Sequence, residues 1–311
     1  MIRPPRWGRI AISQRLAPSL TVLMVLGACG GQATHVGASA PYFPPTLTFP
    51  SPEPSPAPAP SHVFVIVLEN RSFAQVIGSG YIAQLAQQYA YASNYHGVSH
   101  PSLPNYLALT SGTTYGIADD GWHNLPAGGL GAQLTAAGID WRAYMDGMSR
   151  GCYSSPYPYA LKHNPFAYYG GSCPSQVVPF SNFATDMSGN VPRFVWITPD
   201  LCHDGHDCSN AVVNSWLSQT VPVILNSGAW KDNGVLYITW DEGEDSANSV
   251  LTLVIHPDPL LHRSDKSYNH YSLLATIEEE LGVPRLGAAA QATPMDDLLA
   301  TTPLPKSRQK M

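Results

Sequence analysis

The sequence contains few basic residues, few cysteines and no internal repeat. Lys and Arg together number 16 against 22 Asp and Glu, which gives a net charge of -6. A chain with this balance has no basic stripe for a phosphate backbone, so nucleic-acid binding is disfavoured. An anionic substrate would have to be met locally, by a metal ion or by a few cations.

The N-terminus has the features of an export signal. Residues 1–19 carry four arginines, and the apolar run at 20–28 (LTVLMVLGA) is too short to span a bilayer. The run continues into Cys29 as LGAC, which resembles a bacterial lipobox. We therefore expect a lipoprotein-type signal peptide over 1–28 and a lipid anchor on Cys29. The alternative is a plain signal peptide that ends near an unrelated cysteine.

A change of composition marks where the folded part begins. Residues 29–61 are rich in Pro, Ala and Ser and carry almost no charge, so they cannot bury a core and are expected to form an extended tether. We predict one catalytic domain over 62–300, followed by a tail at 301–311. The protein would then act in the cell envelope, membrane-anchored or periplasmic, or be secreted.

Four cysteines remain once Cys29 is set aside. An even number in an oxidising compartment indicates disulfides, and four cysteines allow three pairings. The local pairing is the simplest, and it consists of Cys152–Cys173 and Cys202–Cys208.

The predicted domain alternates short β-branched runs with helical patterns, which indicates an α/β sheet. Nearly continuous apolar runs are typical of strands covered on both faces. The expected strands are 62–69, 140–145, 193–199, 234–240 and 249–255, and the expected helices are 81–90, 130–138 and 269–282. Residues 146–190 read as a long turn-rich excursion, and excursions of this length are usually functional or disordered.

Polar side chains follow three of the predicted strands. Glu69 and Asn70 end the first, the stretch 202–208 (CHDGHDC) follows another, and Asp241 and Glu242 end a third. Ligand groups collect at the carboxyl ends of strands in such sheets, and these oxygen ligands suit a divalent cation. We predict a metal site there, and the alternative is a solvated acidic turn at 241–245. The sequence leaves the ion open among Ca, Mg, Mn, Zn and Fe.

Ser102 lies in the stretch HPSLPNYLALTSG, where two prolines hold it in a rigid, non-helical approach to a helix that begins with YLALTSG. A serine before a helix is most often an N-cap. It becomes a nucleophile only if a base or metal makes its proton easier to remove.

The loop CHDGHDC allows three interpretations: a metal or catalytic loop, a zinc knot made by its cysteines, and a stapled polar turn. Export makes the zinc-knot interpretation less favourable, because the cysteine thiols of an exported protein should be oxidised. We predict a disulfide-stiffened active-site loop in which the bond positions histidine.

Six motifs occur in one order: ENRSF, HPSLPNYLALTSG, YALKHNP, WITPDLCHDGHDCS, WDEGE and NHYSLLATIEEELG. In this order they resemble the phosphoesterase family of bacterial and fungal acid phosphatases and phosphocholine-type phospholipases C, in the alkaline phosphatase superfamily. The resemblance covers 62 to about 285. It implies a mixed, mostly parallel sheet sandwiched between helices, and hydrolysis of small phosphate esters through a phosphoserine intermediate.

The resemblance also implies roles for individual residues. The metal ligands would be Glu69, Asn70, Ser102, Asp241 and Glu242, with Ser102 as nucleophile. A histidine would protonate the leaving oxygen at mildly acidic pH, and the candidates are His206 and His163. Candidate substrate-binding residues are Lys162, Asp207, His203, Asp120 and His270. Asp204 is also a candidate, and for all of these except Lys162 a structural role is an equal alternative.

Two other functions remain open at this point. The same serine and metal would serve a phospholipase C or another phosphodiesterase, and a lipid anchor would place either beside its substrate. A non-catalytic surface lipoprotein that binds a ligand or partner is the other alternative.

Overall fold

The structure is a computed structural model that describes residues 59–257 and 263–299. The predicted signal peptide, the lipidation of Cys29, the tail after 300 and all but the last three residues of the tether lie outside the described residues. Among the described residues, no helix is both long enough and apolar enough to cross a membrane.

The described strands form one nine-stranded mixed sheet in the order β4-β3-β5-β1-β6-β7-β2-β8, with β9 also paired to β2. The central strands β3, β5, β1 and β6 are mutually parallel, and β7 and β2 add an antiparallel side. The strands are β1 Val63–Leu68, β2 Ala90–His96, β3 Trp141–Met145, β4 Val177–Pro179, β5 Phe194–Thr198, β6 Val235–Trp240, β7 Ser249–Ile255, β8 Arg263–Ser264 and β9 Tyr268–Asn269.

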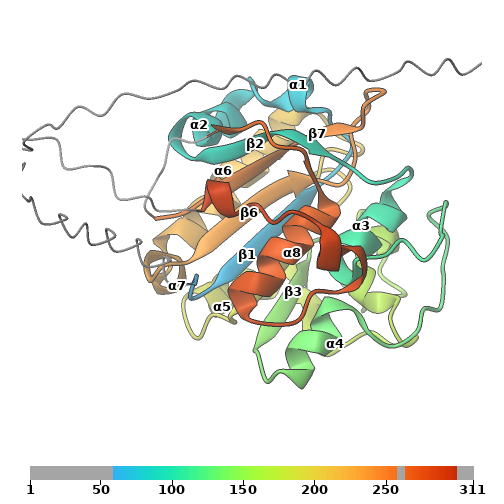
Figure 1. Ribbon diagram of the computed structural model, residues 1–311. Helices are drawn as coiled ribbons and strands as arrows, with labels where there is room; N and C mark the ends of the chain where they lie inside the picture. The colour runs from blue at the N-terminus through green and yellow to red at the C-terminus, as the bar shows by residue number, and fades with distance from the viewer. Residues whose placement is uncertain (1–58, 258–262, 300–311) are drawn as a thin grey trace, which may run out of the picture. The chain divides into compact units, whose positions relative to one another are not determined.

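Helices cover the sheet on both faces, as the layers in Figure 1 show. On one face α8 packs against α3 and β1, and α3 packs against α4; on the other α6 packs against α2, α5 and α7. The helices are α1 Phe73–Val76, α2 Gly80–Gln88, α3 Ser102–Ser111, α4 Gly129–Ala136, α5 Phe183–Met187, α6 Asn210–Asn226, α7 Gly228–Lys231 and α8 His270–Leu281. The mixed, mostly parallel sheet between helices that the sequence predicts is confirmed.

The two helical layers explain why the central strands read as unbroken apolar runs. Every residue of β1 and β6 is fully buried, because no face of either strand meets solvent. Each large apolar side chain buried in this way contributes about 2 kcal/mol to the free energy of unfolding. The sheet is therefore a rigid base for the polar groups at its edge.

The sequence patterns do not predict two large elements of the fold. The strand β2 has the polar sequence AYASNYH, and its register with β7 shifts between Ala92 and Tyr95, which breaks the alternation of apolar residues. The helix α6 contains Pro222 and many polar residues. Tertiary packing stabilises both elements against weak local preferences.

The excursion at 146–190 is ordered by short elements. It contains three 3-10 turns, Leu161–His163, Pro165–Ala167 and Phe180–Asn182, as well as β4 and α5. A disulfide joins Cys152 to Cys173 across its middle, and a second joins Cys202 to Cys208. The structure therefore contains the local pairing named above.

Candidate active site

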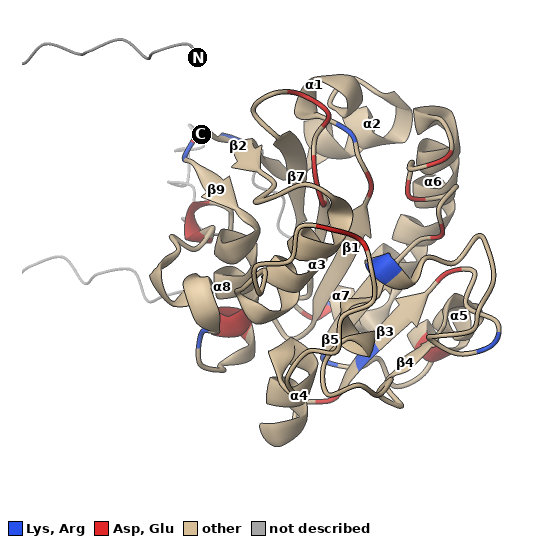
Figure 2. Ribbon diagram, turned by 90° about the vertical axis from the view of Figure 1, so that its right-hand side faces the viewer, with Lys and Arg blue, Asp and Glu red and all other residues tan. Residues whose placement is uncertain are grey.

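Three parallel neighbours, β5, β1 and β6, bring acidic residues to one edge of the sheet. Glu69 directly follows β1, Asp241 directly follows β6, and Asp200 lies two residues beyond β5. All three carboxylates are buried, and Glu69 and Asp241 have no exposed surface. Figure 2 shows acidic segments in the loops between α1, α3 and α6, with few basic segments among them. The edge is a concentrated source of negative charge.

Asn70 links two of these strand ends. Its backbone N–H donates to Asp241 Oδ1 at 3.3 Å, and its side-chain Nδ2 donates to Glu242 Oε1 at 3.1 Å. Its φ of 38° lies in the left-handed region, where asparagine is among the few residues that are tolerated without a large penalty. With Nδ2 engaged in this way, the amide oxygen Oδ1 has no hydrogen-bond partner.

Ser102 is the first residue of α3, so the helix begins four residues earlier than the sequence suggests. Pro101 occupies the N-cap position, and the fully buried Ser102 hydroxyl donates to Glu69 Oε2 at 2.9 Å. A capping serine would instead accept a backbone N–H. The N-cap alternative is therefore not what the structure shows.

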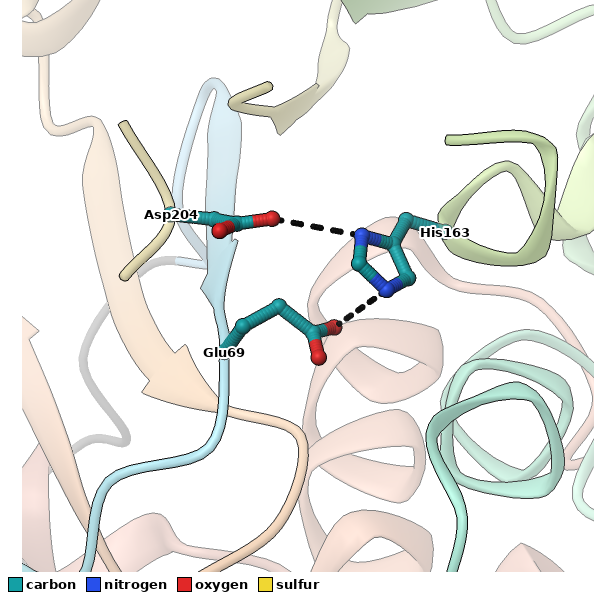
Figure 3. A group of neighbouring side chains, drawn as sticks. All are labelled: Glu69, His163 and Asp204. Atoms are coloured by element: carbon teal, nitrogen blue, oxygen red, sulfur yellow. Dashed lines mark ion pairs between the residues drawn. The ribbon is translucent and has the colours of Figure 1, made fainter. Parts of the chain in front are cut away.

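His163 lies between two carboxylates, as Figure 3 shows. Its Nε2 is 3.2 Å from Glu69 Oε1, and its Nδ1 is 3.2 Å from Asp204 Oδ2. Both contacts are within ion-pair distance, but neither is aligned as a hydrogen bond. The ring stacks on Tyr106 with centroids 5.2 Å apart and planes 11° apart. Burial lowers the pKa of His163 well below its usual value, and the positive charge of Lys162 adds to this effect.

The acidic groups around His163 hold their protons strongly in the absence of a cation. Burial raises the pKa of Glu69 well above its usual value, and the charges of Asp241 and Asp204 raise it further. Burial and then Glu242 raise the pKa of Asp241. Burial raises the pKa of Asp204 to about 8. Several carboxylates that desolvate and repel one another in this way are ionised together only beside a compensating positive charge.

The same groups contain buried oxygens that nothing satisfies. Among the described residues, four oxygen atoms at this edge have no hydrogen-bond partner: Glu69 Oε1, Asn70 Oδ1, Asp204 Oδ2 and Asp241 Oδ2. Unsatisfied buried oxygens are costly and few in native proteins. Carboxylate and amide oxygens are hard ligands for a divalent cation, and Glu69, His163 and Asp204 have ligand atoms within 4.8 Å of one another. The donor set therefore fits a metal ion.

A chain of polar contacts between partly exposed side chains lies beside this cluster. Lys162 Nζ donates to Asp120 Oδ2 at 2.9 Å and lies 3.3 Å from His206 Nε2. The other ring nitrogen of His206, Nδ1, is 2.7 Å from Asp207 Oδ1. Burial lowers the pKa of Lys162, but the hydrogen bond that Lys162 donates to Asp120 and the charge of Glu69 outweigh burial and raise the pKa overall. Lys162 is thus a fixed cation.

Asp120 connects that chain to the start of α3. Its Oδ1 accepts the backbone N–H of Leu103 at 3.0 Å, and its Oδ2 accepts from Lys162. The carboxylate satisfies one N–H of the first turn, which otherwise has no partner within the helix. Asp120 therefore positions both Ser102's helix and Lys162.

The CHDGHDC loop is tied to the strand end by backbone contacts. Glu69 N–H donates to the Asp204 carbonyl at 3.0 Å, and the Arg71 guanidinium donates to the carbonyls of Gly205 at 2.6 Å and Cys208 at 3.2 Å. Because Cys202 and Cys208 are joined to each other, they do not form a zinc knot. The loop instead contributes Asp204 and His206 to the cluster.

One of the predicted substrate-binding residues, His203, does not contact the cluster around Glu69. His203 lies in a second group of polar side chains, where its Nδ1 is 2.7 Å from Asp146 Oδ2 and 3.2 Å from Asp200 Oδ2. Its ring stacks on Trp216. The ligand atoms of His203, Asp146 and Asp200 lie within 4.8 Å of one another, so His203 belongs to a group separate from the one that contains Glu69.

His270 is fully buried at the start of α8. One ring nitrogen contacts the hydroxyl of Tyr95 at 3.0 Å, and the other contacts the backbone carbonyl of Asp241. Burial lowers the pKa of His270 to about 4, so the ring is neutral. Its contact with a backbone carbonyl suits a role in positioning Asp241.

Sequence reasoning missed some members of the site. Tyr106 is four residues after Ser102, in a stretch that the sequence predicts only as the start of a helix. His100 contacts the Glu242 carboxylate and was not singled out. Asp204, for which the sequence leaves a structural role equally open, lies against His163 in the cluster that contains Glu69. The i to i+4 spacing of Ser102 and Tyr106 places both on one face of α3 and was the available signal.

The arrangement of the sheet matches known structures. A protein in the alkaline phosphatase superfamily from Vibrio parahaemolyticus superposes with a TM-score of 0.55 at 13% identity, covering 73% of this chain and 68% of that one. The phosphonate monoester hydrolase of Agrobacterium radiobacter gives a TM-score of 0.52 at 11% identity, covering 76% and 78%. Identities this low concern the fold alone, and they confirm an alkaline-phosphatase-like fold.

The sequence comparisons identify the family of the chain. The model of the Phosphoesterase family matches residues 80–284, and the chain belongs to this family. A phosphatidylinositol-3-phosphatase of Mycobacterium tuberculosis is 32% identical over 254 residues, covering 76% of this chain and 82% of that protein. A phosphate-repressible acid phosphatase of Penicillium chrysogenum is 28% identical over 243 residues, covering 71% of this chain and 59% of its own length. The predicted enzyme class, phosphoric ester hydrolase, is confirmed.

Proposed function

We propose that the protein is an exported, metal-dependent acid phosphatase that hydrolyses phosphomonoesters through a phosphoserine intermediate on Ser102. One observation carries this proposal. The buried Ser102 hydroxyl donates to Glu69, and Glu69 belongs to a cluster with four buried oxygens that lack partners. A nucleophile and a cation site thus meet at a single carboxylate.

The residues that would hold the ion are the strand-end ligands Glu69, Asn70, Asp241, Glu242 and Ser102. When bound, a divalent cation supplies positive charge that stabilises an ionised serine oxygen and the phosphoryl oxygens. Asp204 and His163 are adjacent, and their contacts with Glu69 suit a role as further ligands or as groups that orient it. The ion itself stays undetermined among Ca, Mg, Mn, Zn and Fe.

In the proposed reaction Ser102 Oγ attacks phosphorus in line with the ester oxygen. The O–P bond to serine forms as the P–O bond to the leaving group breaks, and the hydroxyl proton passes to an acceptor such as Glu69, which holds the hydrogen bond. Water then cleaves the phosphoserine, which releases phosphate and restores the hydroxyl.

Lys162 and His206 are proposed to act on the substrate side. Lys162, held by Asp120, offers a fixed cation to a phosphoryl oxygen. His206 is oriented through Nδ1 by Asp207, and its Nε2, which accepts from the Lys162 ammonium at 3.3 Å in the structure, would release this contact to carry the proton for the leaving oxygen. Asp207 would stabilise the imidazolium form that this step requires.

His163 is less suited to that step than the sequence suggests. The ring is buried between Glu69 and Asp204, and its pKa lies well below the usual value, so it is neutral at mildly acidic pH. A neutral, enclosed imidazole makes a poor acid. We therefore assign the acid role to His206 alone and give His163 a positioning role.

The relatives support a monoester substrate. The names of the mycobacterial and fungal relatives describe phosphatases, and Lys162 provides the extra positive charge that a terminal phosphate needs. Export and the domain limits 62–300 are proposed as well, and two disulfides suit an oxidising compartment. A lipid on Cys29 would hold the enzyme at a membrane surface.

The test compares two substrates on one protein. The purified domain, with its metal content determined, should hydrolyse p-nitrophenyl phosphate faster than its bis ester at mildly acidic pH. Acid quenching during turnover should trap one phosphoryl group on the peptide that contains Ser102. Faster hydrolysis of the bis ester would instead favour a phosphodiesterase, and no hydrolysis of either would favour a non-catalytic binding protein.

A further inference from the structure

An exposed aromatic cluster adjoins the proposed active site. Trp122 and Tyr153 are each 48% exposed, although large aromatic side chains usually lie inside. Their rings meet edge to face with centroids 5.1 Å apart, and Trp122 also packs on the buried Tyr168 with centroids 4.9 Å apart. We call Trp122, Tyr153 and Tyr168 the aromatic shelf.

The shelf is connected to the catalytic groups on one side through Asp120. Trp122 follows Asp120 by two residues, so their Cα atoms are at most about 7.6 Å apart. Asp120 in turn contacts Lys162 and the backbone N–H that follows Ser102. Trp122 therefore lies within the reach of a group attached to a phosphate on Ser102.

A second connection runs through the excursion. The Tyr153 hydroxyl donates to the Ala167 carbonyl at 2.7 Å, and the disulfide of the neighbouring Cys152 pins the same segment. Tyr168 packs in a small apolar cluster with Leu103, the residue that follows Ser102, so its ring lies beside the start of α3.

The turn that presents Trp122 is rigid without any contribution from its indole. Asp119 Oδ1 accepts the Gly121 N–H at 2.7 Å and lies 2.7 Å from His123 Nε2. Together with Asp120, these contacts fix the backbone on both sides of Trp122. About half of Trp122 stays exposed on this turn.

We propose that the aromatic shelf is a leaving-group subsite that stacks against a ring in the substrate. This inference rests on the proposed function. The shelf contains no cation, so it suits a neutral leaving group, and a flat aromatic surface binds best to another flat ring, aromatic or sugar-like. Substrates with ring leaving groups would then be preferred over acyclic ones.

Binding can be measured without turnover. Phenylphosphonate should bind the metal-loaded protein about tenfold more tightly than methylphosphonate, because stacking on an aromatic side chain is worth roughly 1–3 kcal/mol. Trp122→Ala should abolish that preference while leaving methylphosphonate affinity unchanged, and Trp122→Phe should largely retain it. Tyr157→Ala is the matched control, since Tyr157 is 66% exposed and has no ring contact among the described residues.

Kinetics separate the possible rings and keep the two proposals distinct. In Trp122→Ala, kcat/KM for phenyl phosphate, inositol monophosphate or both should fall about tenfold, with glycerol phosphate unaffected, and the pattern identifies the ring. An equal loss for all three substrates would overturn the subsite, as would phosphonate affinities that do not depend on the phenyl group. Wild-type protein that binds phenylphosphonate but hydrolyses nothing would overturn the proposed function alone.

Discussion

The Ser102 hydroxyl donates a 2.9 Å hydrogen bond to Glu69, which lies 33 positions earlier in the chain. The serine comes from the first turn of α3 and the carboxylate from the end of β1. Their contact depends on α3 packing over the carboxyl edge of the sheet. The proposed nucleophile and the proposed metal site therefore depend on one packing relationship.

Ser102→Ala should reduce kcat by about a thousandfold or more, because it removes the nucleophile and leaves the other residues of the site in place. The free energy of unfolding should change by only about 1 kcal/mol, the value of one hydrogen bond. Ser99→Ala, in the same loop but outside α3, is the control. Steady-state kinetics with urea unfolding checks both values, and unchanged hydrolysis in Ser102→Ala would remove Ser102 from the mechanism.

Asp241→Asn should have opposite effects with and without metal. In metal-free protein at neutral pH it should raise the melting temperature, because burial and then Glu242 raise the pKa of Asp241, and the folded protein must either keep that proton or bury the charge, whereas asparagine does neither. It should also abolish the stabilisation by added cation, which reaches about 2.7 kcal/mol at a hundredfold excess over Kd.

The control for that substitution is Asp232→Asn, because Asp232 is exposed and precedes the other end of β6. It should keep the cation-dependent rise in melting temperature. Calorimetry of chelated and reloaded protein measures both effects. An identical response of Asp241→Asn and wild type to the cation would remove Asp241 from the ligand set.

Glu280 should make the domain more stable in acid. Burial raises its pKa from 4.5 to about 8, and Tyr237 donates to its carboxyl group. Below pH 4.5 folded and unfolded chains both hold the proton. As the pH rises towards 8 the unfolded chain loses the proton first, so the free energy of unfolding falls.

Glu280→Gln should flatten this decline and stabilise the domain at neutral pH. Glu278, with a pKa also near 8 through burial, should leave part of the slope in place. Glu279→Gln, at the exposed neighbour, should preserve the wild-type slope. Urea unfolding from pH 4 to 9 measures the three profiles, and parallel curves for wild type and Glu280→Gln would contradict the assignment.

Replacing Cys202 and Cys208 by serine should cost about 2 kcal/mol of stability, from the entropy of a small closed loop. The larger effect should fall on kcat, because the loop positions Asp204 and His206. The paired Cys152→Ser and Cys173→Ser variant tests whether any disulfide loss has the same result. Free thiols at 202 and 208 in the exported protein would contradict this account of the loop.

Local sequence was sufficient for the central strands and their acidic ends. The buried runs of β1, β5 and β6 read as strands because both of their faces are covered, and Glu69 and Asp241 follow such runs directly. The polar strand β2 and the proline-containing helix α6 could not be predicted, because tertiary packing stabilises them against weak local preferences. Ser102 could be named from its motif, but its role as the first residue of α3 could not.

The sequence by itself determined the strand ends that carry the oxygen ligands, because those ligands follow apolar runs whose direction in a parallel sheet is fixed. Only the tertiary structure decided that His163 is enclosed between Glu69 and Asp204 and is neutral, while His206 faces Lys162. The two histidines have the same chemistry in the sequence. Burial and the charge of Lys162 lower the pKa of His163, and both depend on segments that meet only when the chain folds.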